Sequence, residues 1–138
     1  MSRSVLALAA GVHLEIVGHA YDCLPLEACG LLEGVYGSGR IERFHPCANA
    51  AASSKVYTVE AREQLRATRE AEDRGNDIIG VMHSHTHTTA YPSPTDVAQA
   101  PDPTWHYIIV SLKDHEPVVR SYRIVDGNIE EEAVVSVL

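Results

Sequence analysis

The chain has no long hydrophobic run, few cysteines and a deficit of positive charge. No stretch approaches the roughly 20 continuous apolar residues that a membrane-spanning helix needs. Eleven basic side chains stand against 19 acidic ones, and the resulting net charge of -8 repels phosphate backbones and anionic lipid headgroups. The sequence therefore predicts neither a nucleic acid nor a membrane as a partner.

The number and spacing of the three cysteines argue against a disulfide framework. Cys23, Cys29 and Cys47 cannot all pair within one chain, and they match no CxxC or zinc-ribbon spacing. We therefore expect a protein of the reducing cytoplasm. The first 15 residues contain a short apolar run like that of a signal peptide, but His13 and Glu15 interrupt it, and a first strand is the preferred interpretation.

Length and composition favour one domain. A chain of 138 residues buries roughly two thirds of the surface that its unfolded form exposes, so it can fold without disulfides. No low-complexity linker, internal repeat or change in composition marks a second domain. We expect a single domain over residues 1–138.

Hydrophobic periodicity predicts strands mixed with helices. Helices are expected over residues 11–23, before Pro25, and over 59–75, where Gly75 ends a run of good helix formers. Strands are expected at 5–9, 55–60, 77–85 and 105–112, in a hairpin over 29–47, and in a hairpin over 117–138 that turns at Asp126 and Gly127. The sum is an α/β domain with a mixed, curved sheet flanked by helices.

The stretch GVMHSHTHTTAYPSPTD, residues 80–96, places three histidines, a serine and an aspartate after a buried strand. On a strand, His83 and His85 project from the same face, with Cα atoms about 6 to 7 Å apart. Two imidazoles can then converge on one ion, whereas they would cost free energy if they were buried without partners. The spacing favours a metal site over a polar loop.

Ser93 and the Pro-Thr-Asp that follows it resemble the start of a helix. Capping alone explains this pattern, since serine is a good N-cap, proline suits the first helical position, and Asp96 lies near the positive end of the dipole. Such a helix would carry Asp96 back toward the strand end. His83, His85 and Asp96 would leave a tetrahedral Zn²⁺ with one open position, which is typical of catalytic zinc sites. His87, on the same strand face, is an alternative ligand, although a loop position is favoured for it.

The other polar residues have simpler interpretations. Ser84 and Thr86 point to the opposite strand face and are interpreted as structural. Cys29, two residues after Glu27, is a nucleophile in principle, but its place in an apolar strand favours a buried, inert thiol. The remaining histidines are scattered singly and are interpreted as core or surface residues: His13, His19, His45, His106 and His115.

A family resemblance rests on these residues. His83-x-His85, seven residues, Ser93, two residues and Asp96, with Glu27 upstream in LPLEACGLLEG, resemble the JAMM motif of the JAB1/MPN-domain metalloproteases, which have a cytidine-deaminase-like fold. The resemblance covers nearly the whole chain. It implies Zn²⁺ held by the two histidines and the aspartate, Glu27 as catalytic acid and base, and Ser93 near the oxyanion. Without the motif, Glu27 would be interpreted as a solvated residue between a helix and a strand.

The resemblance also implies a substrate. The short chain, with EACG, HYIIVSL and RSYRIVDG, resembles the bacterial peptidases that release cysteine from a ubiquitin-like sulfur-carrier protein. It implies hydrolysis of the amide after the carrier's C-terminal Gly-Gly, a step of cysteine biosynthesis. A deubiquitinase-like isopeptidase acting on other ubiquitin-like conjugates and a non-catalytic MPN scaffold stay open as alternatives. A homodimer also stays open.

Overall fold

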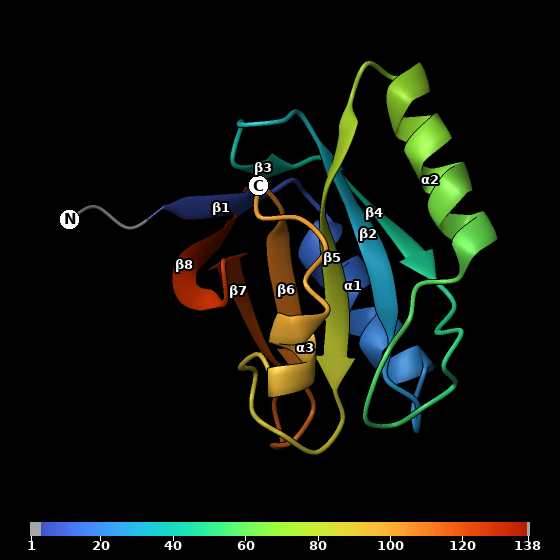
Figure 1. The fold of residues 1–138 in the computed structure, drawn as a ribbon, viewed down its shortest axis with the longest axis vertical. Coiled ribbons are helices and arrows are strands. Elements are labelled where there is room, and N and C mark those ends of the chain that lie inside the picture. Colours follow the sequence, from blue (N-terminus) through green and yellow to red (C-terminus); the bar gives the residue numbers. More distant parts are fainter. Residues whose placement is uncertain (1–3, 138) are drawn as a thin grey trace.

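The computed structural model describes residues 4–137, which form one mixed eight-stranded sheet with three helices (Figure 1). The strand order is β3-β1-β8-β7-β6-β5-β2-β4. The strands are β1 (Val5–Leu8), β2 (Cys29–Gly34), β3 (Arg40–Ile41), β4 (Arg43–Cys47), β5 (Asp77–His85), β6 (His106–Ser111), β7 (Val118–Val125) and β8 (Asn128–Ser136). The helices are α1 (Val12–Asp22), α2 (Ala61–Asp73) and α3 (Pro94–Ala98). The predicted α/β class is confirmed.

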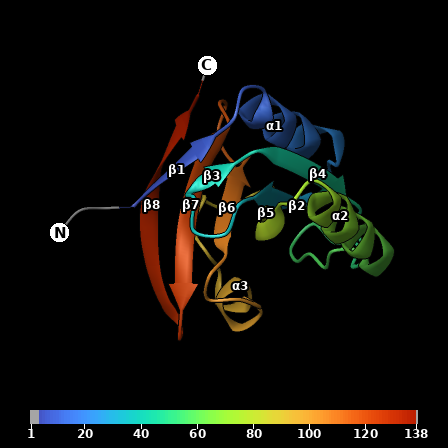
Figure 2. The same cartoon turned by 90° about the horizontal axis from the view of Figure 1, so that it is seen from above.

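Each face of the curved sheet carries its own hydrophobic core. Successive residues of a strand point to opposite faces. Met82 of β5 accordingly packs in the core of α1, around Ile16, whereas Val81 packs in the core that includes Ala67 of α2. Figure 2 shows α1 on one side of the sheet and α3 on the other. Within residues 4–137, no helix combines the length and the apolar character needed to cross a membrane.

Both predicted hairpins form, one of them in altered form. β7 and β8 are joined by Asp126 and Gly127 with φ of 50° and 78°, the positive values that a two-residue hairpin turn requires. In the first hairpin, the second strand is divided at Glu42. β4 pairs with β2, while β3 pairs in parallel with β1. The end of β2 passes close to β3 at Gly34. Only glycine fits there, since a Cβ would lie 2.3 Å from the carbonyl oxygen of Arg40.

The strand predicted over residues 55–60 is wrong. The segment makes only an isolated bridge between Asn49 and Val59. The Asn49 side chain takes up the backbone groups that a strand would pair: its Nδ2 donates to the Val56 carbonyl oxygen at 3.0 Å, and its Oδ1 accepts from the Thr58 N–H at 3.0 Å. Side-chain bonds of this kind compete with ladder formation. The result is a loop that runs past the end of β5.

Candidate metal centre

The three residues predicted as metal ligands converge near the end of β5. His83 Nε2 and His85 Nε2 lie 3.1 Å apart, and Asp96 Oδ2 lies 3.1 Å from the first and 3.0 Å from the second. Ligands bound to a tetrahedral Zn²⁺ at about 2.0–2.1 Å are themselves about 3.3 Å apart. The triangle is therefore close to the size that one ion requires, and these residues could hold a metal.

Hydrogen bonds and burial set the protonation of these groups. His85 Nδ1 donates to the Thr89 carbonyl oxygen at 2.7 Å, which turns Nε2 toward Asp96. Burial lowers the pKa of His83 despite its bond to Asp96. Burial alone would also lower the pKa of His85 and raise that of Asp96. The hydrogen bonds outweigh it in both, so that the pKa of His85 is raised and the pKa of Asp96 is lowered. The directions for His83 and Asp96 favour the neutral imidazole and the ionised carboxylate that metal ligation needs, whereas His85 would give up a proton to a bound cation.

The start of α3 orients the carboxylate. Ser93 Oγ accepts from the Asp96 N–H at 3.0 Å, and the Ser93 N–H donates to Asp96 Oδ2 at 2.9 Å, which makes the predicted cap reciprocal. Pro94 occupies the first helical position. In this cap the Ser93 oxygen is an acceptor, so its own hydrogen is left for another partner.

Glu27 lies beside this triangle, held by backbone contacts. Its N–H donates to the Ser53 carbonyl oxygen at 2.8 Å, and the next residue, Ala28, donates to Ser84 Oγ at 2.7 Å. Glu27 is 4% exposed and lines a cavity of about 290 Å³ together with His85 and Ser93. Burial raises its pKa to about 7. Its buried Oε1 finds no hydrogen-bond partner within residues 4–137, as expected of a group whose partner comes from outside the chain.

The polar residues interpreted as structural have structural contacts. Ser84 accepts from Ala28, and Thr86 Oγ1 donates to the Ser54 carbonyl oxygen at 3.0 Å. His87 is exposed and lies outside the triangle, at the cavity that Glu27 lines. The structure thus brings His83, His85 and Asp96 together, and it does not add His87.

The cysteines lack the features of a nucleophile. Cys29 is fully buried, and burial, with Cys47 nearby, raises the pKa of its thiol to about 12. All three cysteines are free thiols, in line with the expected absence of a disulfide framework. A thiolate at Cys29 is therefore not formed at neutral pH, which supports the interpretation of an inert thiol.

Sequence reasoning missed Tyr57. Its ring stacks on the His83 imidazole, with centroids 4.4 Å apart and planes 16° apart. Tyr57 also lines a second cavity of about 360 Å³ with Trp105 and with Val81, in the middle of β5. The residue lies in the loop that was predicted as a strand, and no local pattern signals its contact with a residue 26 positions along the chain.

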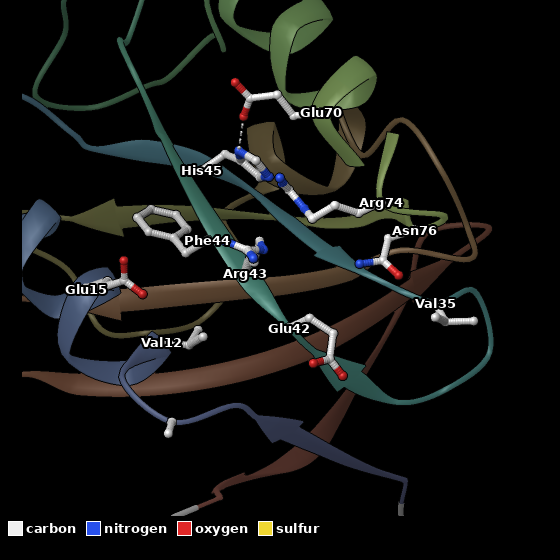
Figure 3. Close-up of a pocket in the computed structure, with 11 residues that line it drawn as sticks. Val12, Glu15, Val35, Glu42, Arg43, Phe44, His45, Glu70, Arg74 and Asn76 are labelled. Carbon is white, nitrogen blue, oxygen red and sulfur yellow. Dashed lines mark ion pairs between the residues drawn. The ribbon is translucent and has the colours of Figure 1, made fainter. Parts of the chain in front are cut away.

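A larger cavity lies away from the three ligands. It measures about 810 Å³ and lies between α1, α2 and the edge strand β4. Figure 3 shows that charged side chains of both signs surround it, among them Arg43, Glu70 and Arg74. None of the candidate metal ligands lines it, so its volume does not mark the metal centre.

The chain is similar to known proteins over most of its length. Residues 9–125 match the family model described as prokaryotic homologs of the JAB domain. The chain is 46% identical over 131 residues to the CysO-cysteine peptidase of Mycobacterium tuberculosis, covering 94% of this chain and 90% of that protein. It is 34% identical over 116 residues to a desampylase of Haloferax volcanii, covering 80% and 84%.

Two solved structures show the same architecture. A protein from Desulfitobacterium hafniense superposes with a TM-score of 0.86 at 34% identity, covering 96% of this chain and 92% of that one. A JAB1/MPN domain protein from Archaeoglobus fulgidus has a TM-score of 0.60 at 19% identity, covering 94% and 99%, and shows the fold alone. The chain belongs to the family of prokaryotic JAB-domain homologues, and it is a hydrolase of the JAB/MPN type with a His-His-Asp group that could hold a metal.

Proposed function

We propose that this chain is a cytoplasmic zinc metallopeptidase that hydrolyses the amide bond between the C-terminal Gly-Gly of a ubiquitin-like sulfur-carrier protein and cysteine. Cysteine would be released from the carrier. The observation that carries the proposal is the triangle of His83, His85 and Asp96 beside the buried Glu27, in a chain 46% identical to a CysO-cysteine peptidase.

The donor set favours zinc. Two imidazole nitrogens and one carboxylate oxygen suit Zn²⁺ in a catalytic site, which keeps its fourth position for substrate or water. Zinc held by these residues would polarise the scissile carbonyl and make hydroxide available near neutral pH. His83 and His85 are buried, at 2% and 4% exposed, and His85 also lines the cavity at Glu27, through which a substrate could reach the ligands.

Glu27 is assigned as the general acid and base. Its raised pKa of about 7 lets the carboxyl group accept a proton from the attacking water and deliver it to the leaving amine at neutral pH. Proton transfer by a positioned side chain contributes about 10² to 10⁴ in rate. The bonds from the Glu27 N–H to the Ser53 carbonyl oxygen and from the Ala28 N–H to Ser84 Oγ fix the backbone that carries this side chain, and they leave Oε1 of the carboxyl group without a partner within residues 4–137.

Ser93 is assigned as the oxyanion donor. Its oxygen accepts from the Asp96 N–H, while its O–H hydrogen remains to donate to the oxygen of the tetrahedral intermediate. One hydroxyl therefore serves both cap and catalysis, because the two roles use different atoms. A single oxyanion donor contributes about 3 to 4 kcal/mol to the transition state.

The cleavage reaction tests the proposal. A purified carrier protein that ends in Gly-Gly-Cys, incubated with the zinc-loaded chain, should lose one cysteine, as seen by mass spectrometry. Glu27→Gln should keep the metal and lose turnover by orders of magnitude, while the exposed Glu15→Gln serves as a matched control. If the chain cleaved only a ubiquitin–lysine conjugate, the proposal would be wrong and the chain would be an isopeptidase. If it cleaved neither substrate, the result would favour a non-catalytic scaffold.

A further inference from the structure

We propose that Lys55 binds the α-carboxylate of the leaving amino acid and thereby restricts the enzyme to C-terminal residues with a free carboxylate. The inference rests on the proposed function and adds a specificity-determining residue to it. It explains how the site would distinguish a carrier–amino acid conjugate from an isopeptide, in which the leaving amine is the end of a lysine side chain.

The cavity beside Glu27 suits the leaving group. A general acid must reach the amine that departs, so this amine lies next to the Glu27 carboxyl group. The cavity measures about 290 Å³, at the lower end of the range of roughly 300–1,000 Å³ for small-molecule sites. It has room for one small amino acid but not for a folded protein.

Lys55 is the only lysine or arginine among the described residues that line this cavity. The chain has only two lysines and a net charge of -8, so a cation beside the reacting groups is not a consequence of a generally basic surface. Within residues 4–137, Lys55 forms no ion pair with an acidic side chain. Its ammonium group is therefore available to an anionic ligand.

Hydrogen bonds of the two residues before Lys55, Ser53 and Ser54, fix the loop that carries it. The Ser53 carbonyl oxygen accepts from the Glu27 N–H at 2.8 Å, and Ser53 Oγ accepts from the Lys55 N–H at 3.0 Å. The Ser54 carbonyl oxygen accepts from Thr86 Oγ1 at 3.0 Å. The base of the lysine side chain is thus held next to both the catalytic carboxyl group and the strand end.

The chemistry of the leaving group matches this placement. In an α-amino acid a single carbon separates the amine from the carboxylate, so an amine at Glu27 puts the carboxylate in the same cavity as Lys55. The lysine side chain of an isopeptide has four methylene groups next to its amine, and these would offer Lys55 no anion. A charge-assisted hydrogen bond of this kind changes binding by about 10- to 100-fold.

The test uses two matched substrates. One is a carrier that ends in Gly-Gly-Cys, and the other is the same carrier with a C-terminal cysteinamide, which lacks the negative charge. The wild-type chain should prefer the acid by about 10- to 100-fold in kcat/KM, and Lys55→Gln should bring the ratio close to one by weakening only the acid. Lys113, the other lysine of the chain, does not line the cavity, so Lys113→Gln should leave the ratio unchanged.

A binding measurement separates recognition from chemistry. In the Glu27→Gln background, calorimetry should show that Lys55→Gln weakens binding of the acid substrate but not of the amide. Equal cleavage of both substrates by the wild-type chain, or an acid preference that survives Lys55→Gln, would overturn the role of Lys55 and leave the proposed function intact. Failure of the wild-type chain to cleave either substrate would overturn both proposals.

Discussion

The ring of Tyr57 lies flat against the imidazole of His83, with 4.4 Å between centroids and 16° between planes. This contact packs a loop residue against a candidate metal ligand. Because an aromatic pair contributes about 0.5–1.5 kcal/mol, Tyr57→Ala should weaken zinc binding by roughly 2- to 10-fold. Tyr57→Phe should keep the affinity, measured by competition with a chelator. Equal losses in both variants would assign the effect to the hydroxyl group instead.

Ser84 connects β5 to the segment that contains Glu27. Its Oγ accepts from the buried Ala28 N–H at 2.7 Å, and Ser84→Ala leaves that donor unpaired. We expect a loss of about 1–3 kcal/mol in the free energy of unfolding, together with a lower kcat, since Glu27 is the neighbouring residue. Denaturant unfolding measures the first and turnover the second. Ser38→Ala, at an exposed serine, is the matched control. Wild-type values of the free energy of unfolding and of kcat in Ser84→Ala would show that the contact is dispensable.

The acid stability of the fold depends on Glu33. This fully buried carboxylate accepts from Arg74 at 2.6 and 2.9 Å, from Asn76 at 2.7 Å, and lies 2.7 Å from His45 Nε2. Burial alone would raise its pKa, but these bonds outweigh burial and lower the pKa from 4.5 to about 2. The folded state holds the proton less readily than the unfolded state, so the contribution is complete above pH 4.5 and is lost as the pH falls to about 2.

Glu33→Gln should therefore flatten the loss of stability between these two pH values and lower stability at neutral pH by about 1–3 kcal/mol, because the charge-assisted hydrogen bonds from Arg74 and Asn76 are weakened. Urea unfolding at several pH values measures both effects. Glu131→Gln is the comparison, since its pair with Arg120 is exposed and contributes less than about 1 kcal/mol. The same acid profile in both variants would remove Glu33 from this role.

Cys29 should be dispensable for turnover. Its thiol is buried and its pKa is raised to about 12, so Cys29→Ser should retain activity within a few-fold, whereas a chelator should abolish it. The measurement is turnover before and after chelation in both proteins. A Cys29→Ser protein that keeps its metal and folds but is inactive would favour a thiol mechanism.

Local rules were enough to predict most of the site. Strand alternation places His83 and His85 on one face, and the serine cap with its following proline positions Asp96, so sequence spacing predicted their approach. The contacts of Tyr57 and Lys55 could not be predicted in this way. They depend on the Asn49 side chain, which bonds to the backbone of a segment with strand propensity and turns it into a loop. The division of the second hairpin strand at Glu42 likewise depends on distant β1.

Metal content in two histidine variants tests the central claim most directly. His85 and His87 are two residues apart and were both candidates from spacing, but only His85 belongs to the triangle. Elemental analysis should find close to one zinc per chain in the wild-type protein and in His87→Ala, and almost none in His85→Ala. Full zinc content in His85→Ala, or its loss in His87→Ala, would contradict the assigned metal centre.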